Sequence, residues 1–153
     1  MKETFKRYVN ALAGALRQEL PDVLDLRAEF AVDGKPYVIT ADEGGSAILV
    51  FAVIGALPHD EAARARIFGR LLHAQFCFSE SCGFSFGVDA DDSFVLLQAM
   101  INPECTNEWH FVALMEKFVK MANVWGRRLN ESTTAAADGG ELSGTESDFA
   151  IPV

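Results

Sequence analysis

The chain has 153 residues, half of them hydrophobic, and its 22 acidic residues outnumber 13 basic ones, giving a formal net charge of −9. This length fits one domain with a core that needs no disulfide or metal. The acidic balance argues against nucleic acid and anionic membranes as partners, since both are negatively charged.

Residues 4–20 are expected to form the first helix. Its amphipathic sequence lacks the apolar core of a signal peptide. The longest apolar run, 47–56, is also shorter than the roughly 20 residues that span a bilayer. We therefore expect a cytoplasmic protein without membrane insertion. Pro21 would end the helix, whose apolar stripe has helical spacing: Phe5, Val9, Leu12, Ala13, Leu16 and Leu20.

Residues 26–40 predict a β-hairpin. Apolar and polar side chains alternate from Leu26 to Val32, as expected of a strand with one buried face. Asp33-Gly34 favours a two-residue turn, because both central positions of a type I′ turn need positive φ. The return strand, 37–40, is short, so sheet edge stays available, and an extended peptide could add there as a further strand.

Two later strands, 47–54 and 94–101, are apolar on both faces. Seven of the eight residues from Phe94 to Ile101 are apolar, although the side chains of a strand point to opposite faces in turn. Both faces must therefore be covered. The chain's own helices can cover one face, and the other most plausibly meets another polypeptide. This pattern predicts a binding protein that forms a homodimer.

Between these two strands the sequence predicts a second helix and a fourth strand. The helix follows Pro58 and has Asp60 and Glu61 in its first turn, where the helix dipole favours carboxylates. Strand 83–89 alternates larger apolar residues with small ones, and the small residues form a flat face against which another backbone can pack. Alternatively, its glycines are only turn or bulge residues.

The dimer is expected to form through this helix together with the fourth and fifth strands. A shared interface of this kind should bury on the order of 1,200 Å² or more in total. The residues that we expect there are Phe68, Leu72, Phe84, Phe86, Val88, Val95 and Leu97.

A third helix is expected over 106–129, followed by a change in composition. Ser, Thr, Ala and Gly then dominate, with acidic residues and no basic ones. This composition is typical of disorder. We therefore divide the chain into a folded domain, 1–130, and an acidic disordered tail, 131–153. The fold class is α+β: an α-β-β-β-α-β-β-α sandwich with an antiparallel sheet packed by helices.

This order of elements resembles the class I type III secretion chaperones, the CesT-like (Tir chaperone) family. The segments that carry the likeness are 71–74 (LLHA), 83–89 (GFSFGVD), 94–98 (FVLLQ) and 118–125 (FVKMANVW). The resemblance implies a homodimeric, cytoplasmic chaperone that wraps an extended segment of a secreted effector around itself. It implies neither nucleotide hydrolysis nor a cofactor.

Two features depart from the family pattern: Ala74-Gln75 stands where an Asn is common, and the acidic tail is long. Both leave open a protein of the same fold without an export client, such as the YbjN-like stress-associated proteins.

Client contact is expected from the first helix and the hairpin. The same residues could instead pack the helix onto the sheet, because a helix stripe at this spacing is usually core. The candidate client-binding residues are Phe5, Val9, Leu12, Phe30, Val32 and Tyr37.

Several Cys and His residues raise the alternative of a zinc protein or a thiol enzyme: His73, Cys77, Cys82, Cys105 and His110. Their spacing matches no zinc motif, and no oxyanion-hole signature accompanies them. The acidic run 89–92 lacks the glycine and the terminal glutamate of a calcium loop. We therefore expect no metal, no catalytic residue and no enzyme activity. Buried, reduced thiols are the simplest account of the cysteines.

Overall fold

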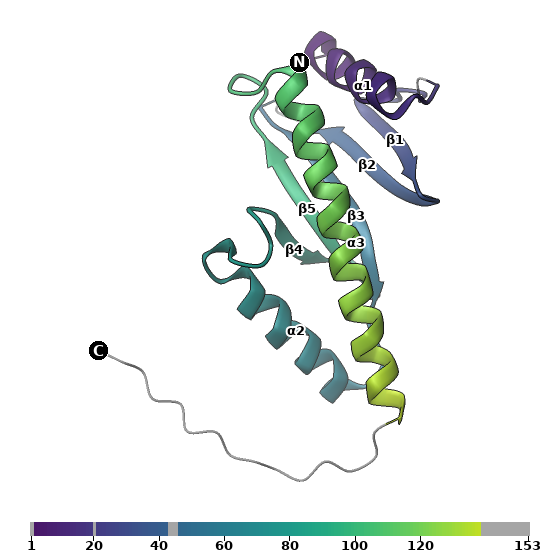
Figure 1. Ribbon diagram of the computed structural model, residues 1–153, viewed down its shortest axis with the longest axis vertical. Helices are drawn as coiled ribbons and strands as arrows, with labels where there is room; N and C mark the ends of the chain where they lie inside the picture. Colours follow the sequence, from purple (N-terminus) through teal and green to yellow (C-terminus); the bar gives the residue numbers. More distant parts are fainter. Residues whose placement is uncertain (1, 20, 43–45, 139–153) are drawn as a thin grey trace, which may run out of the picture.

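The computed structural model describes residues 2–19, 21–42 and 46–138 (Figure 1). Its five strands form one antiparallel sheet in the order β1-β2-β3-β5-β4. The expected α+β class and order of elements are therefore confirmed. The elements are α1 (Lys2–Leu16), β1 (Arg27–Val32), β2 (Lys35–Ala41), β3 (Ile48–Ala56), α2 (Glu61–Gln75), the short 3-10 helix η1 (Phe76–Phe78), β4 (Ser85–Val88), β5 (Phe94–Ile101) and α3 (Glu108–Asp138).

The helices lie unevenly over the sheet. Figure 1 shows α3 running along the sheet, with α1 beside its first half and α2 beside its second half near β4. The predicted hairpin is confirmed, since Asp33 and Gly34 have φ values of 52° and 75°, and Val32 pairs with Lys35. Its return strand is longer than expected.

Two helix boundaries differ from the expected ones. Helix α1 ends at Leu16 instead of Leu20, because Arg17 has a positive φ of 53° and leaves the helix. Helix α3 continues past Leu129 to Asp138, since an alanine run, 135–137, favours helix before Gly139. The rest of the predicted tail, 139–153, lies outside the described residues.

The core lies between α1, α3 and one face of the sheet. In β3 and β5 the side chains alternate between this covered face and an open face. Val95 and Leu97 are fully buried, whereas Phe94 and Met100 on the opposite face are 44% and 78% exposed. The chain's own helices therefore cover only one of the two apolar faces.

The cysteines and the loop after α2 are more exposed than expected of a core. All three cysteines, Cys77, Cys82 and Cys105, are exposed and free, so the expectation of buried thiols is wrong. Phe76, which directly follows α2, is 73% exposed. The backbone explains this exposure: α2 ends at Gln75, and Cys77 and Phe78 have positive φ values that turn the chain away from the core. Among the described residues no helix is long and apolar enough to cross a membrane.

Candidate functional site

A largely apolar groove opens between α1, the β1–β2 hairpin and the first half of α3. We call it the α1–α3 groove, and its cavity measures about 220 Å³. Apolar side chains form nearly all of its wall, and Glu116 and Lys120 are its charged residues. It is lined by Leu12, Ala15, Leu16, Phe30, Val32, Tyr37, Val112, Met115, Glu116, Val119 and Lys120.

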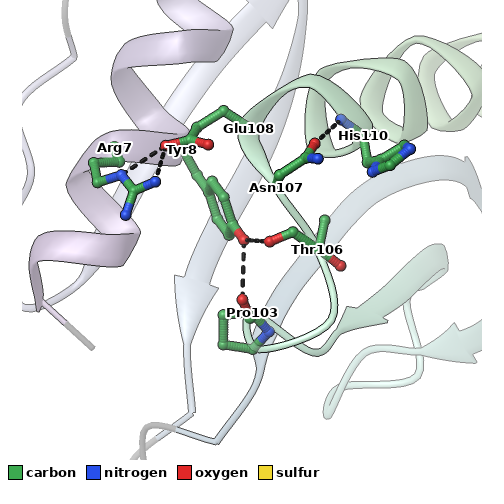
Figure 2. A network of polar contacts seen from close by, with 7 residues as sticks. All are labelled: Arg7, Tyr8, Pro103, Thr106, Asn107, Glu108 and His110. Atoms are coloured by element: carbon green, nitrogen blue, oxygen red, sulfur yellow. Dashed lines mark hydrogen bonds and ion pairs between the residues drawn. The ribbon is translucent and has the colours of Figure 1, made fainter.

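A polar network fastens α1, one wall of this groove, to the start of α3 (Figure 2). The Tyr8 hydroxyl lies within hydrogen-bond reach of two carbonyl oxygens, that of Pro103 at 3.2 Å and that of Thr106. Arg7 donates to the Glu108 carboxylate at 2.6 Å. Burial raises the pKa of Tyr8, and the negative charge of Glu108 raises it further. Tyr8 therefore stays a neutral donor that holds α1 in place.

Tyr37 lies on the floor of the α1–α3 groove. Its ring meets that of Phe118 edge-on at 6.3 Å. Among the described residues its buried hydroxyl has no hydrogen-bond partner. Burial raises the pKa of Tyr37, and the charge of Asp33 adds to the shift. An unpaired buried hydroxyl costs about 1–3 kcal/mol, so a bound polar group that reached it would remove this cost.

The outer edge of β1 lies beside the groove and is partly open. Because Val32 and Lys35 close the two-residue hairpin, Ala31, Glu29 and Arg27 turn their backbone groups away from β2. Leu24 pairs with the backbone of Arg27, and the Gln18 amide donates to the Ala31 carbonyl at 2.6 Å. Within the described part of the chain, the Glu29 N–H and C=O and the Ala31 N–H have no partner. These three groups can pair with one more strand.

The candidate client-binding residues divide into two sets. Leu12, Phe30, Val32 and Tyr37 line the α1–α3 groove, although Leu12, Phe30 and Tyr37 are at most 4% exposed. Phe5 and Val9 are at most 1% exposed, because α1 packs them into the core. Their place favours the alternative stated for them, packing of the helix onto the rest of the domain.

A second apolar groove lies between α2 and β4. We call it the α2–β4 groove, and its cavity measures about 300 Å³. Leu72 on its rim is 72% exposed, and Phe76, one turn beyond, is exposed to the same degree. Apolar surface on this scale is characteristic of a protein interface. The groove is lined by Phe68, Leu71, Leu72, Gln75, Phe86, Gly87 and Val88.

The candidate dimer residues also divide. Four of them, Phe68, Leu72, Phe86 and Val88, lie at the α2–β4 groove. The other three, Phe84, Val95 and Leu97, are covered by the chain itself and are at most 4% exposed. Phe84, for example, meets the Phe118 ring edge-on at 5.1 Å.

The open face of the sheet carries apolar residues that were not assigned to any site. A cavity of about 320 Å³ lies against β3, β5 and β4 there. The alternation of apolar residues in β3 and β5 marked this surface, but it could not say which alternate set faces the helices. The surface includes Leu49, Phe51, Val53, Leu96 and Met100.

The Cys and His residues considered as zinc ligands or nucleophiles do not assemble into a site. His73 and the three cysteines are exposed. Over the described residues, no group of three or more Cys, His, Asp or Glu side chains is placed to hold a metal ion.

Two comparisons identify relatives of this chain. The model of the Tir chaperone protein (CesT) family matches residues 9–126, so the resemblance stated from the sequence is confirmed. No curated protein matches the chain.

Solved structures share the fold. A chain in the ExsC–ExsE complex is 19% identical, with a TM-score of 0.67 over 83% of this chain and 94% of that one. A chain in the HopA1–SchA chaperone–effector complex is 14% identical, with a TM-score of 0.62 over 84% and 94%. A chain in the ExoT–SpcS complex from Pseudomonas aeruginosa is 17% identical, with a TM-score of 0.56 over 80% and 97%. At these identities the similarity is evidence of a shared fold alone.

Proposed function

The chain belongs to the Tir chaperone protein (CesT) family, and from this premise we propose that it binds the N-terminal segment of an effector in extended form for type III secretion. The effector partner fits the solved relatives, which include chains from chaperone–effector complexes. The family is one of chaperones and not of enzymes, so we propose stoichiometric binding without catalysis, in the cytoplasm. The family match favours this function over that of a YbjN-like stress protein or a thiol or metal enzyme.

The observation that carries the proposal is the α1–α3 groove beside an open stretch of β1 edge. An extended client can pair its backbone with Glu29 and Ala31, and backbone pairing supplies affinity for almost any sequence. Every second client side chain would then point toward Phe30 and the groove. The groove would therefore select unfolded segments by the spacing of their apolar side chains.

A test of this proposal removes one outward backbone donor. Ala31→Pro deletes the Ala31 N–H, which no bond to β2 uses, while Ala31→Ser keeps it. Each variant is co-expressed with the effector encoded beside its gene, and capture of the effector is measured after circular dichroism has verified the fold. We expect Ala31→Pro to capture about two- to tenfold less effector, the loss that removal of one hydrogen bond predicts. Equal capture by both variants would contradict strand addition at β1.

We further propose that two copies associate through the α2–β4 groove, at Phe68, Leu72, Phe86 and Val88. Its exposed apolar rim supports this site, since burial of apolar surface at about 25 cal/mol per Å² drives association. Leu72→Asp should shift the protein from dimer to monomer in sedimentation without loss of fold, because Leu72 is largely exposed in one copy. Arg66→Asp, on the exposed surface of the same helix, is the matched control and should remain dimeric. A dimeric Leu72→Asp variant would rule out this interface.

A further inference from the structure

The two edges of the sheet are closed by glutamine side chains to different extents. At β1, the Gln18 amide occupies one backbone group, the Ala31 carbonyl. At β4, the Gln75 side chain occupies two: its Nε2 donates to the Phe84 carbonyl at 3.2 Å, and its Oε1 accepts from the Phe86 N–H at 3.1 Å. A primary amide carries the same donor and acceptor as a peptide group. Gln75 therefore bonds to β4 as a neighbouring strand would.

The register shows that these two groups belong to the free edge of β4. Ser85 and Gly87 pair with Gln98 and Leu96 of β5, and the Asp89 N–H continues this ladder to the Phe94 carbonyl at 3.1 Å. The alternate residues, Phe86 and Val88, must point their backbone groups away from β5. Gln75 thus takes the outward groups at the start of a strand that has only four residues.

The β4 edge would otherwise suit an extended chain. It borders the α2–β4 groove, just as the β1 edge borders the α1–α3 groove. An unprotected edge beside an apolar groove is a template for strand addition and for aggregation, and proteins commonly block such edges. As far as the described residues show, the Phe86 carbonyl and the Val88 backbone are the groups that remain on this edge after Gln75 has bonded.

We propose that Gln75 decides which edge of the sheet accepts an extended chain: it closes β4 and so confines strand addition to β1. Gln75 is then a specificity-determining residue that touches no client itself. At the α2–β4 groove it leaves a second copy mainly side-chain packing. The part of this inference that concerns the client rests on the proposed function, whereas the closure of β4 does not.

The first test needs no client. In full-length Gln75→Ala, the Phe86 amide should exchange its hydrogen about tenfold faster in dilute solution, because its acceptor is gone. At higher concentration, sedimentation should show species larger than those of the unmodified protein, as the opened edges pair. Adding Val88→Pro, which deletes the next outward N–H, should abolish the larger species. The control Gln98→Ala, on the open face of β5, should behave like the unmodified protein.

Gln75→Glu extends the test if the alanine variant fails to fold. It keeps the acceptor for the Phe86 N–H but loses the donor to the Phe84 carbonyl, so it should open the edge partly and give fewer of the larger species. Unchanged Phe86 exchange in folded Gln75→Ala, or no larger species from folded Gln75→Glu, would overturn the proposal. Faster exchange with no change in association at any concentration would overturn it as well.

A second test separates this inference from the proposed function. The effector segment found by co-expression is bound to the unmodified protein and to Gln75→Ala, and amide exchange is compared over β1 and β4. Protection of β1 alone in the unmodified protein, and of both strands in the variant, is the expected result. If β4 gains no protection in the variant, Gln75 does not set the edge. If β1 is unprotected in the unmodified protein, the proposed client site fails instead.

Discussion

The two faces of the β3–β5 pair are equally apolar but differ in what covers them. On one face Val95 and Leu97 are sealed under the chain's own helices, while on the other Phe94 and Met100 remain largely exposed. These residues alternate in a single strand, so composition alone cannot cause the difference. It arises because α1 and α3 both lie on one side. One face therefore serves stability, and the described residues leave the other uncovered.

The largest difference between the faces should come from a buried charge. Leu97→Asp would place a carboxylate in the core, where it has no partner, at a cost of several kcal/mol. We expect this variant not to fold, as judged by circular dichroism. Met100→Asp on the open face should keep the native spectrum. Equal stability of the two variants would erase the distinction between the faces.

Truncating an aromatic ring should sharpen the same contrast. Phe118 on α3 is fully buried and packs edge-on against Tyr37 and Phe84. Phe118→Ala should therefore lower the free energy of unfolding by about 3–5 kcal/mol, measured by urea denaturation. Phe94→Ala on the open face should cost less than about 1 kcal/mol. A large loss from Phe94→Ala would mean that the open face is also part of the core.

Removing a polar contact that holds α1 in place should have an intermediate effect on the free energy of unfolding. Tyr8→Phe keeps the ring stacked on Phe111 at 4.8 Å. It removes the hydroxyl that can donate a hydrogen bond to the carbonyl oxygens of Pro103 and Thr106. We expect a loss of about 1–3 kcal/mol in urea denaturation. Amide exchange should rise first in α1, since the helix would loosen on one side of the groove. An unchanged α1 would show that apolar packing alone holds it.

A smaller effect on stability is expected from making the open face polar. Val53→Ser and Met100→Ser together should change the free energy of unfolding by no more than about 1 kcal/mol. Binding of an apolar-surface dye to the folded protein should nevertheless fall, because both side chains are at least half exposed. Dye binding equal to that of the unmodified protein would place the accessible apolar surface elsewhere.

The smallest expected effect is a pH dependence at the start of α3. The Glu108 carboxylate accepts from its own backbone N–H first and from Arg7 second, and both bonds hold its pKa below the ordinary 4.5. A lowered pKa means that this stabilisation is present above pH 4.5 and is lost as the pH falls through the native value. Fluorescence of the neighbouring, exposed Trp109 should change in that range. The change should be absent in Glu108→Gln.

Much of the fold could be predicted because local signals agree with the final structure. The Asp33-Gly34 turn, the helix start after Pro58 and the alternation in β1 each determine a local conformation. The ends of α1 and α3 could not be predicted in the same way. The first is set by the positive φ of Arg17, and the second by a weak helix propensity with no stop signal before Gly139.

The sites were harder to predict than the fold. Periodicity identified the stripe on α1, but it could not separate Leu12, which lines the groove, from Val9, which is sealed beneath it. For β5 it did not reveal which alternate set faces the helices. Gln75 stood out only as part of a departure from the family pattern, and its role could not be predicted because it depends on backbone groups of a strand that lies ten residues further on.

The account depends most on the claim that one copy leaves apolar surface for another polypeptide to cover. Sedimentation velocity of the purified full-length chain tests it directly. We expect a mass twice the 16.7 kDa of one chain at micromolar concentration. A single-chain mass that persists at much higher concentration, in a protein that binds no apolar dye, would contradict the claim.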